Sequence, residues 1–127
     1  MDTEFIFVNA AFTKREADGS DLRFPVKNVI GIAVGHIAST ASEDFVLLQV
    51  NSLEDQQALI FLEESGYETP AQIRKVLTPR DALIQDLSGN GCGDIVIAQG
   101  RGLTAFTSQS LLFPVDGSGN IAATPKT

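Results

Sequence analysis

The chain has 127 residues, of which 43% are hydrophobic and 20% are charged, and its formal net charge is -7. This length suits one domain with one core, and this composition excludes intrinsic disorder. The excess of acidic side chains repels phosphate backbones and anionic lipid surfaces, so neither nucleic acid nor a membrane is an expected partner.

The single cysteine, Cys92, excludes an internal disulfide and any zinc site made of several cysteines. The first residues carry Asp2 and Glu4 where a secretory signal would carry basic residues, and no apolar run of the sequence approaches the roughly 18 residues that span a bilayer. We therefore expect synthesis and folding in a cytoplasm.

The N-terminal part of the chain predicts strands. Residues 4–9 are aromatic and β-branched, which predicts a strand that continues to Lys14. Residues 22–26 alternate with the period of a half-buried strand and would pair with the first strand as a hairpin. Residues 29–37 and 45–50 are apolar on both faces, which is typical of central strands.

The middle of the chain predicts helices. Residues 53–65 follow capping residues, carry an apolar face and end before a glycine, which together predict a helix. Two Thr-Pro pairs come next, and each places a capping residue before a first-turn proline. They predict two short helices, over residues 70–77 and 79–86.

The C-terminal part predicts strands again, over residues 95–98, 103–106 and 111–115. Residues 116–127 predict a turn, a last short strand at 121–123 and a polar tail. No repeat with a period of 20 to 50 residues is evident in the sequence. The order of elements predicts one α+β domain over residues 1–127, with a mostly antiparallel sheet or partial barrel, one medium helix and two short helices.

The most specific motif runs from Asp86 to Asp94, Asp-Leu-Ser-Gly-Asn-Gly-Cys-Gly-Asp, and an apolar strand follows it. Oxygen-bearing side chains recur at alternate positions, and calcium takes 6 to 8 oxygen ligands from wound loops of this kind. Over residues 86–98 the motif resembles the calcium loop of integrin-type FG-GAP repeats, which form propellers from several copies. The resemblance implies a cation held by Asp86, Ser88, Asn90, the carbonyl of Cys92 and Asp94.

A second interpretation of the same motif needs no cation. A glycine-rich turn between two elements lets Asp and Asn side chains bond their own backbone, and residues 86–94 have the composition of such a turn. Apart from calcium, no cofactor is expected from the sequence.

His36 is the only histidine, so a Ser-His-Asp or Cys-His catalytic arrangement would have to use it. It lies in a predicted central strand, and no serine or cysteine near it has the context of a nucleophile elbow. We therefore expect no catalytic residue and no enzyme.

Three classes of function remain open. The first is a non-catalytic structural or interaction subunit of a larger assembly, such as a capsid-associated or decoration protein of a virus particle, whose partners are other proteins or copies of itself. The second is a calcium-dependent binding module that uses residues 86–94. The third is a small-molecule binder or an enzyme that uses His36, with Tyr67 as a further polar candidate. The lack of catalytic motifs favours the first class.

Overall fold

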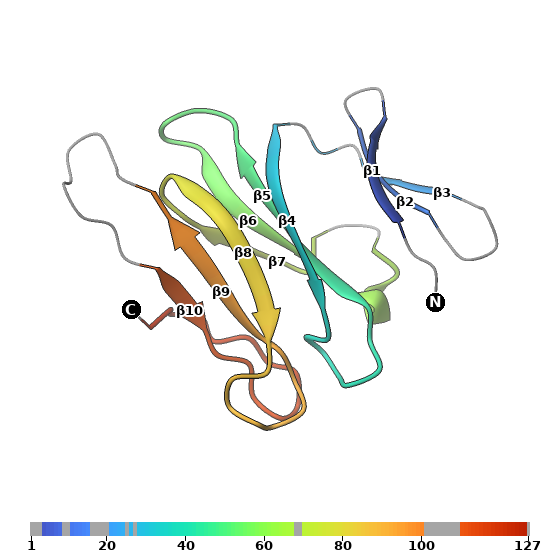
Figure 1. Cartoon of the computed structure of the whole chain (residues 1–127), viewed down its shortest axis with the longest axis vertical. Coiled ribbons are helices and arrows are strands. Elements are labelled where there is room, and N and C mark those ends of the chain that lie inside the picture. The colour runs from blue at the N-terminus through green and yellow to red at the C-terminus, as the bar shows by residue number, and fades with distance from the viewer. Residues whose placement is uncertain are drawn as a thin grey trace.

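The computed structural model describes residues 4–8, 11–15, 21–24, 26, 28–67, 70–100 and 110–126, with the backbone alone up to residue 24. Nearly all regular structure in these residues is antiparallel sheet, and the one helical element among them is a single 3-10 turn, η1 (Glu63–Ser65). No helix in these described parts is long and apolar enough to cross a membrane. Figure 1 shows the strands.

The described residues form three antiparallel sheets, which follow one another along the chain (Figure 1). The first has the order β1-β2-β3, with β1 (Glu4–Val8), β2 (Ala11–Arg15) and β3 (Asp21–Phe24). The second has the order β4-β5-β6-β7, with β4 (Val29–Gly35), β5 (Asp44–Val50), β6 (Gln56–Phe61) and β7 (Gln72–Lys75). The third has the order β10-β9-β8, with β8 (Pro79–Gln85), β9 (Asp94–Gln99) and β10 (Leu111–Phe113).

The main core lies between the second and third sheets. We call the side of the second sheet that carries Val46, and the side of the third sheet that carries Val96, the front face. The opposite side of each of these two sheets is the back face. The front face of the second sheet packs on the back face of the third, and this core includes Val46, Leu48, Ile60, Ile95, Ile97 and Phe113, all at most 2% exposed. Burial of this many large apolar side chains is the dominant stabilising term.

The first strands of these two sheets, β4 and β8, lie against each other. Gly35 permits their close approach, because a Cβ atom at that position would lie 2.6 Å from Cγ2 of Ile84. The front-face positions of β4 are all small: Gly31, Ala33 and Gly35.

The back face of the second sheet holds a second, aromatic cluster. The Phe45 ring stacks on the ring of Phe61 at a centroid distance of 4.9 Å and on the ring of Tyr67 at 5.5 Å. Leu47 and Leu59 complete the cluster, and Ile32 packs against it. The two middle strands of this sheet are therefore buried on both faces, as their continuous apolar sequence requires.

The second and third sheets are two copies of one unit. Strand β4 begins at residue 29 and β8 at residue 79, while β5 begins at residue 44 and β9 at residue 94, so one offset of 50 residues relates both pairs. The register shifts at matching places, between Val29 and Gly31 and between Pro79 and Asp81.

The residues before β4 and β8 match as well. Asn28 and Thr78 both have positive φ, 57° and 39°. Their carbonyls accept hydrogen bonds from the N–H groups of Val50 and Gly100, at 3.1 Å and 2.6 Å. A non-glycine residue rarely adopts positive φ, so its recurrence at matching positions reflects one shared backbone path.

The last strands of the two units also correspond. Phe45 pairs with Phe61 on β6, and Ile95 pairs with Phe113 on β10. Beyond β10, Leu112 forms an antiparallel bridge with Lys126, which occupies the place that β7 holds in the second sheet. Each unit therefore has three antiparallel strands and a fourth paired position, which is strand β7 in the second sheet and a single bridge in the third.

The predicted α+β class is wrong, because the three predicted helices are absent. The predicted helix 53–65 is instead a hairpin turn followed by β6 and η1. The residues expected to cap it close the turn: the N–H of Asn51 donates to the carbonyl of Asp55 at 2.9 Å, and the N–H of Asp55 donates to Oγ of Ser52 at 3.1 Å. The apolar run that follows is buried on both sides of a sheet rather than on one face of a helix.

The two predicted helices that start at Thr-Pro pairs, 70–77 and 79–86, are strands β7 and β8. Thr78 does not cap a helix, since its hydroxyl donates to the carbonyl of Gly100 at 2.7 Å. Pro79 is the first residue of β8, a position where a strand tolerates the missing N–H. Cap-forming residues make the same local hydrogen bonds at strand ends as at helix starts, so the pattern misled the prediction.

The strand predictions fared better. The strands predicted at 29–37, 45–50 and 95–98 are confirmed as β4, β5 and β9. The single strand predicted from residue 4 to Lys14 is two strands, β1 and β2, and β3 pairs with β2. The strand predicted at 103–106 lies outside the described residues.

Candidate functional site

Asp94 is the first residue of β9, and its side chain binds the loop that joins β8 to β9. Its side chain is 2% exposed. Oδ2 accepts hydrogen bonds from the N–H of Leu87 at 2.9 Å, from the N–H of Ser88 at 3.1 Å and from the Ser88 hydroxyl at 3.0 Å. Oδ1 accepts one from the N–H of Val115 at 2.8 Å. The buried carboxylate therefore ties the loop to the segment after β10.

Asp86 winds the exposed part of the same loop. Its Oδ1 accepts hydrogen bonds from the N–H groups of Gly89 at 2.8 Å and Asn90 at 3.1 Å, and its Oδ2 accepts one from the N–H of Gly91 at 2.9 Å. Gly89 and Gly91 have φ of 74° and 90°, which glycine adopts without strain.

Asn90 and Cys92 complete the predicted ligand set. Oδ1 of Asn90 accepts from the N–H of Cys92 at 3.0 Å, and its side-chain amide donates to the carbonyl of Val115 at 2.7 Å. The Cys92 side chain is 3% exposed and its Sγ lies 3.7 Å from the carbonyl of Ala38.

The five predicted calcium ligands thus share one loop, but the side-chain oxygens of Asp86, Asn90 and Asp94 accept from main-chain N–H groups, and the Ser88 hydroxyl donates to Asp94. Seven hydrogen bonds to the carboxylates of Asp86 and Asp94 hold the loop. Within the described residues, no group of three or more His, Cys, Asp or Glu side chains is placed to hold a metal ion. This geometry favours the glycine-rich turn, and the calcium ligand set stays a prediction.

A calcium titration tests the two interpretations of the loop. Because its own N–H groups already satisfy the carboxylates, we expect the same melting temperature in excess calcium and in excess chelator, measured by circular dichroism. A higher melting temperature in calcium would contradict this expectation if Asp86→Asn abolishes the increase and Asp116→Asn retains it. Asp116 is the matched control because it heads a second Asp-Gly turn and accepts hydrogen bonds from the N–H groups of Ser118 and Asn120.

The pKa of Asp94 lies below its ordinary value of 3.8. Burial raises the pKa of this carboxyl, but the hydrogen bonds from Val115, Ser88 and Leu87 together lower the pKa by a larger amount. Donors that point at a carboxylate stabilise its ionised form. Asp94 is therefore a buried carboxylate whose ionised form is stabilised by hydrogen bonds from the loop and from the Val115 amide.

Asp44 is the equivalent of Asp94 in the second sheet, and it is not among the residues predicted from the sequence. The carboxylate is fully buried. Its Oδ2 accepts from the N–H groups of Ile37 at 2.8 Å and Ala38 at 2.9 Å and from the hydroxyl of Ser42 at 2.5 Å. Its Oδ1 accepts from the N–H of Glu63 at 2.9 Å.

The two aspartates use main-chain donors at the same offsets, whereas their hydroxyl donors, Ser42 and Ser88, lie two and six residues before them. Each accepts from the N–H groups seven and six residues before it, and each reaches with Oδ1 to the segment after the third strand of its unit. The Asp44 loop carries His36 where the other loop carries Asp86, and it has no glycine between residues 36 and 43. The buried aspartate, rather than the glycine-rich acidic string, is therefore what the two loops share.

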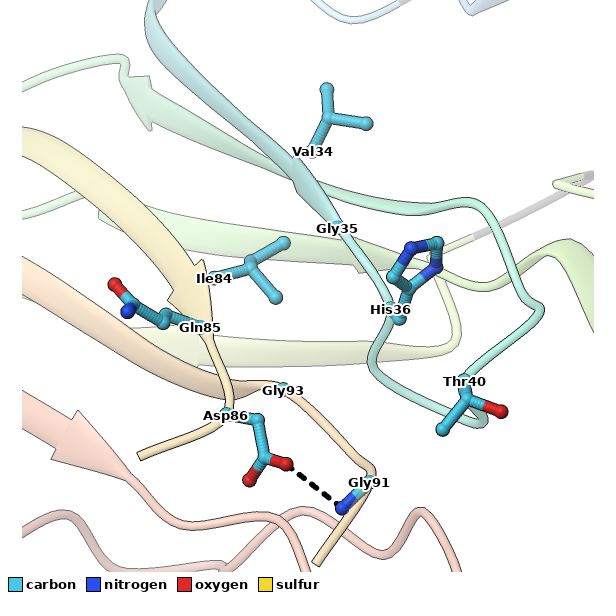
Figure 2. A pocket seen from close by; sticks show the side chains of 9 residues that line it. All are labelled: Val34, Gly35, His36, Thr40, Ile84, Gln85, Asp86, Gly91 and Gly93. Carbon is cyan, nitrogen blue, oxygen red and sulfur yellow. Dashed lines mark hydrogen bonds between the residues drawn. The ribbon is translucent and has the colours of Figure 1, made fainter. Parts of the chain in front are cut away.

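His36 is exposed and lies just after β4. Its Nδ1 lies 2.5 Å from the carbonyl of Ser42, and because a carbonyl only accepts, Nδ1 carries the proton of this bond. His36 lines a hollow of about 440 Å³ together with Thr40 and Asp86. Figure 2 shows that the Asp86 carboxylate is directed at the Gly91 amide and not at the imidazole.

Tyr67 is not brought into an arrangement with His36. Its ring belongs to the aromatic cluster on the back face, and its hydroxyl donates to the carbonyl of Glu43. The two polar candidates from the sequence therefore each have a main-chain partner and do not form a joint site.

The two units differ at their front faces, since that of the second sheet is buried and that of the third is partly exposed. Leu83, Val96 and Leu112 lie side by side across β8, β9 and β10. Leu83 is 51% exposed, and Val96, Ala98 and Leu112 are partly exposed. A hollow of about 90 Å³ lies between β8 and β9 on residues that include Asp81, Leu83 and Val96. We call this surface the open front face.

Comparisons with models of protein families, with curated proteins and with solved structures find no match to this chain. The fold and the site define an all-β protein of stacked antiparallel sheets, each of the second and third organised by one buried aspartate.

Proposed function

We propose that this protein is a non-catalytic structural and interaction subunit of a larger assembly, in which stacked β-sheet units provide the contact surfaces. It is made in a cytoplasm and taken up into that assembly, of which a virus particle with decoration proteins is one example. Its partners are proteins, including copies of itself.

The observation that carries the proposal is that the two units stack with unlike faces in contact, the front face of one on the back face of the other. The second sheet presents its front face to the back face of the third, and the third presents the same front face to solvent. An interface in which two different faces meet does not close on itself after one contact, so the same contact is available for a further sheet. Quasi-repetitive proteins use such stacking to build extended structures.

The polar groups of the two loops support the same proposal. The carboxylates of Asp44 and Asp94 accept hydrogen bonds from main-chain N–H groups, which stabilises the ends of the units. His36 donates to a main-chain carbonyl. These groups serve the fold, and chemistry on a substrate is not needed to account for them.

The native mass of the protein tests the proposal. The chain is tagged in its own source at its native level, and the size of the particle that contains it is measured by native electrophoresis and gel filtration. We expect a particle well above the 13.5 kDa of one chain, with the same size for His36→Ala. Migration as a single 13.5 kDa chain would overturn the proposal.

A further inference from the structure

The open front face of the third sheet retains the apolar residues of a packed sheet. Val96 and Leu112 stand at the positions that Val46 and Ile60 hold in the second sheet, where they are 0% and 1% exposed. Leu83, at 51% exposure, adds a large apolar side chain on the first strand of the unit. The open front face therefore resembles the front face of the second sheet, which packs on the back face of the third sheet within this chain.

The first strand of the third sheet departs from that match in a specific way. The small front-face residues of β4 let β8 approach closely, as Gly35 against Ile84 shows. The corresponding residues of β8 are Asp81, Leu83 and Gln85, which are larger and exposed. A sheet with a strand opposite β8 could not approach as closely, whereas a sheet that lacks this strand would leave room for these side chains.

Within the described residues, the first sheet has that form. Its strands β1, β2 and β3 precede β4 as β5, β6 and β7 precede β8, in the same antiparallel order. Among the described residues it has three strands, and none takes the place that β4 and β8 hold in the other units. The sequence of β1 is apolar from Phe5 to Val8, a pattern typical of a strand buried on both faces.

We propose that the open front face of the third sheet binds the first sheet, β1-β2-β3, in a second copy of this chain. This inference rests on the proposed function and names the partner. Leu83 then faces a sheet in which no described strand takes the place of β4, and the contact repeats the sheet-on-sheet packing inside the chain. Because each copy offers both the open front face and a first sheet, two copies that exchange this contact complete a closed dimer.

The first test is the mass of the purified full chain by sedimentation velocity over a range of concentrations. We expect a reversible dimer of twice 13.5 kDa. Leu83→Asp places a charge on the contact and should raise the dimer dissociation constant by about tenfold or more. Leu53→Asp is the matched control, because Leu53 is 65% exposed in the turn between β5 and β6, outside the surface, and this variant should remain dimeric.

The second test identifies the surfaces that meet. A photo-crosslinking amino acid replaces Gln85, and the protein is mixed with an isotope-labelled copy so that crosslinks between chains can be recognised by mass spectrometry. We expect crosslinked peptides from residues 4–24 of the other copy. Crosslinks from residue 85 to residues 79–99 of the other copy would mean that two front faces meet, and would overturn the proposal.

The outcomes separate this inference from the proposed function. A monomer at all concentrations, with melting temperatures showing that wild type and both variants are folded, would overturn the second-copy proposal. If the particle in the source is nevertheless much larger than one chain, the proposed function stands and a different protein covers the open front face.

Discussion

Replacing Asp94 by asparagine should lower the free energy of unfolding by about 3 kcal/mol, because it leaves buried donors without an acceptor. The carboxylate accepts four hydrogen bonds at 2% exposure. The asparagine NH₂ group must face either the donors of Leu87 and Ser88 or the N–H of Val115, so one set of N–H groups meets another donor. Urea unfolding followed by circular dichroism measures the loss, with an unchanged slope as the sign that only stability has changed.

Asp116→Asn is the control for this prediction. Asp116 also accepts hydrogen bonds from two main-chain N–H groups and from the side chain of Asn120, but it is exposed, so water can replace the lost acceptor. We expect a clearly smaller loss. Equal losses for the two variants would show that burial of Asp94 does not set the cost.

The lowered pKa of Asp94 also gives its contribution a pH dependence. The folded protein holds this carboxyl at a pKa below its ordinary value of 3.8. Its stabilising effect is therefore complete above that ordinary value and is lost as the pH falls through it toward the folded pKa. The difference in unfolding free energy between wild type and Asp94→Asn should therefore narrow at acid pH. A difference that stays constant down to the acid transition would contradict a lowered pKa of Asp94 in the folded protein.

Replacing Asp44 by asparagine should cost a similar amount, about 3 kcal/mol, because Asp44 makes the equivalent four hydrogen bonds and is fully buried. The loss of the Glu63 bond also frees the start of η1, which closes the second unit. The same urea experiment applies. The comparison of the two variants measures whether the two loops are energetic as well as geometric equivalents.

Glu54→Gln is the control for Asp44, since Glu54 is an exposed acid in the turn between β5 and β6 and its substitution should change stability by about 0.5 kcal/mol or less. A negligible effect of Asp44→Asn beside a large effect of Asp94→Asn would show that only the glycine-rich loop depends on its aspartate.

The strands that sequence reasoning predicted best are those whose apolar residues leave one interpretation. Residues 45–50 are apolar on both sides, and a run of this length fits a central strand. The failures lie where residues have two uses. Asn51 and Ser52 close a hairpin turn with the hydrogen bonds they would make at a helix start, and only the register of β5 with β6 decides between these outcomes.

The site was predicted in part. The string from Asp86 to Asp94 was recognised as a unit, and it is one wound loop, but the direction of its carboxylates toward N–H groups depends on backbone torsions that the sequence does not reveal. Asp44 was missed because a lone acid before an apolar run has no special spacing. Comparison of Asp44-Phe45-Val46 with Asp94-Ile95-Val96 was the available signal.

The repeat itself was hidden by divergence. Between residues 29–50 and 79–100, the identical pairs at the 50-residue offset are Asp44 with Asp94, Val46 with Val96, and Gln49 with Gln99. Packing constrains size and polarity more than identity, so two sheets can keep one architecture with few shared residues. Register, bulges and the positive φ of Asn28 and Thr78 preserve what the side chains have lost.

Tyr67 and Cys92 lie in different units, so each can report on the unfolding of its own unit. Tyr67 is the only tyrosine in a chain without tryptophan, and its ring is buried against the second sheet, so intrinsic fluorescence follows that unit. Cys92 is the only cysteine and is buried in the loop of the third sheet, so the rate at which a thiol reagent labels it follows the other. Equal opening free energies from both signals would mean that the units unfold together, and unequal values would make each sheet a separate cooperative element.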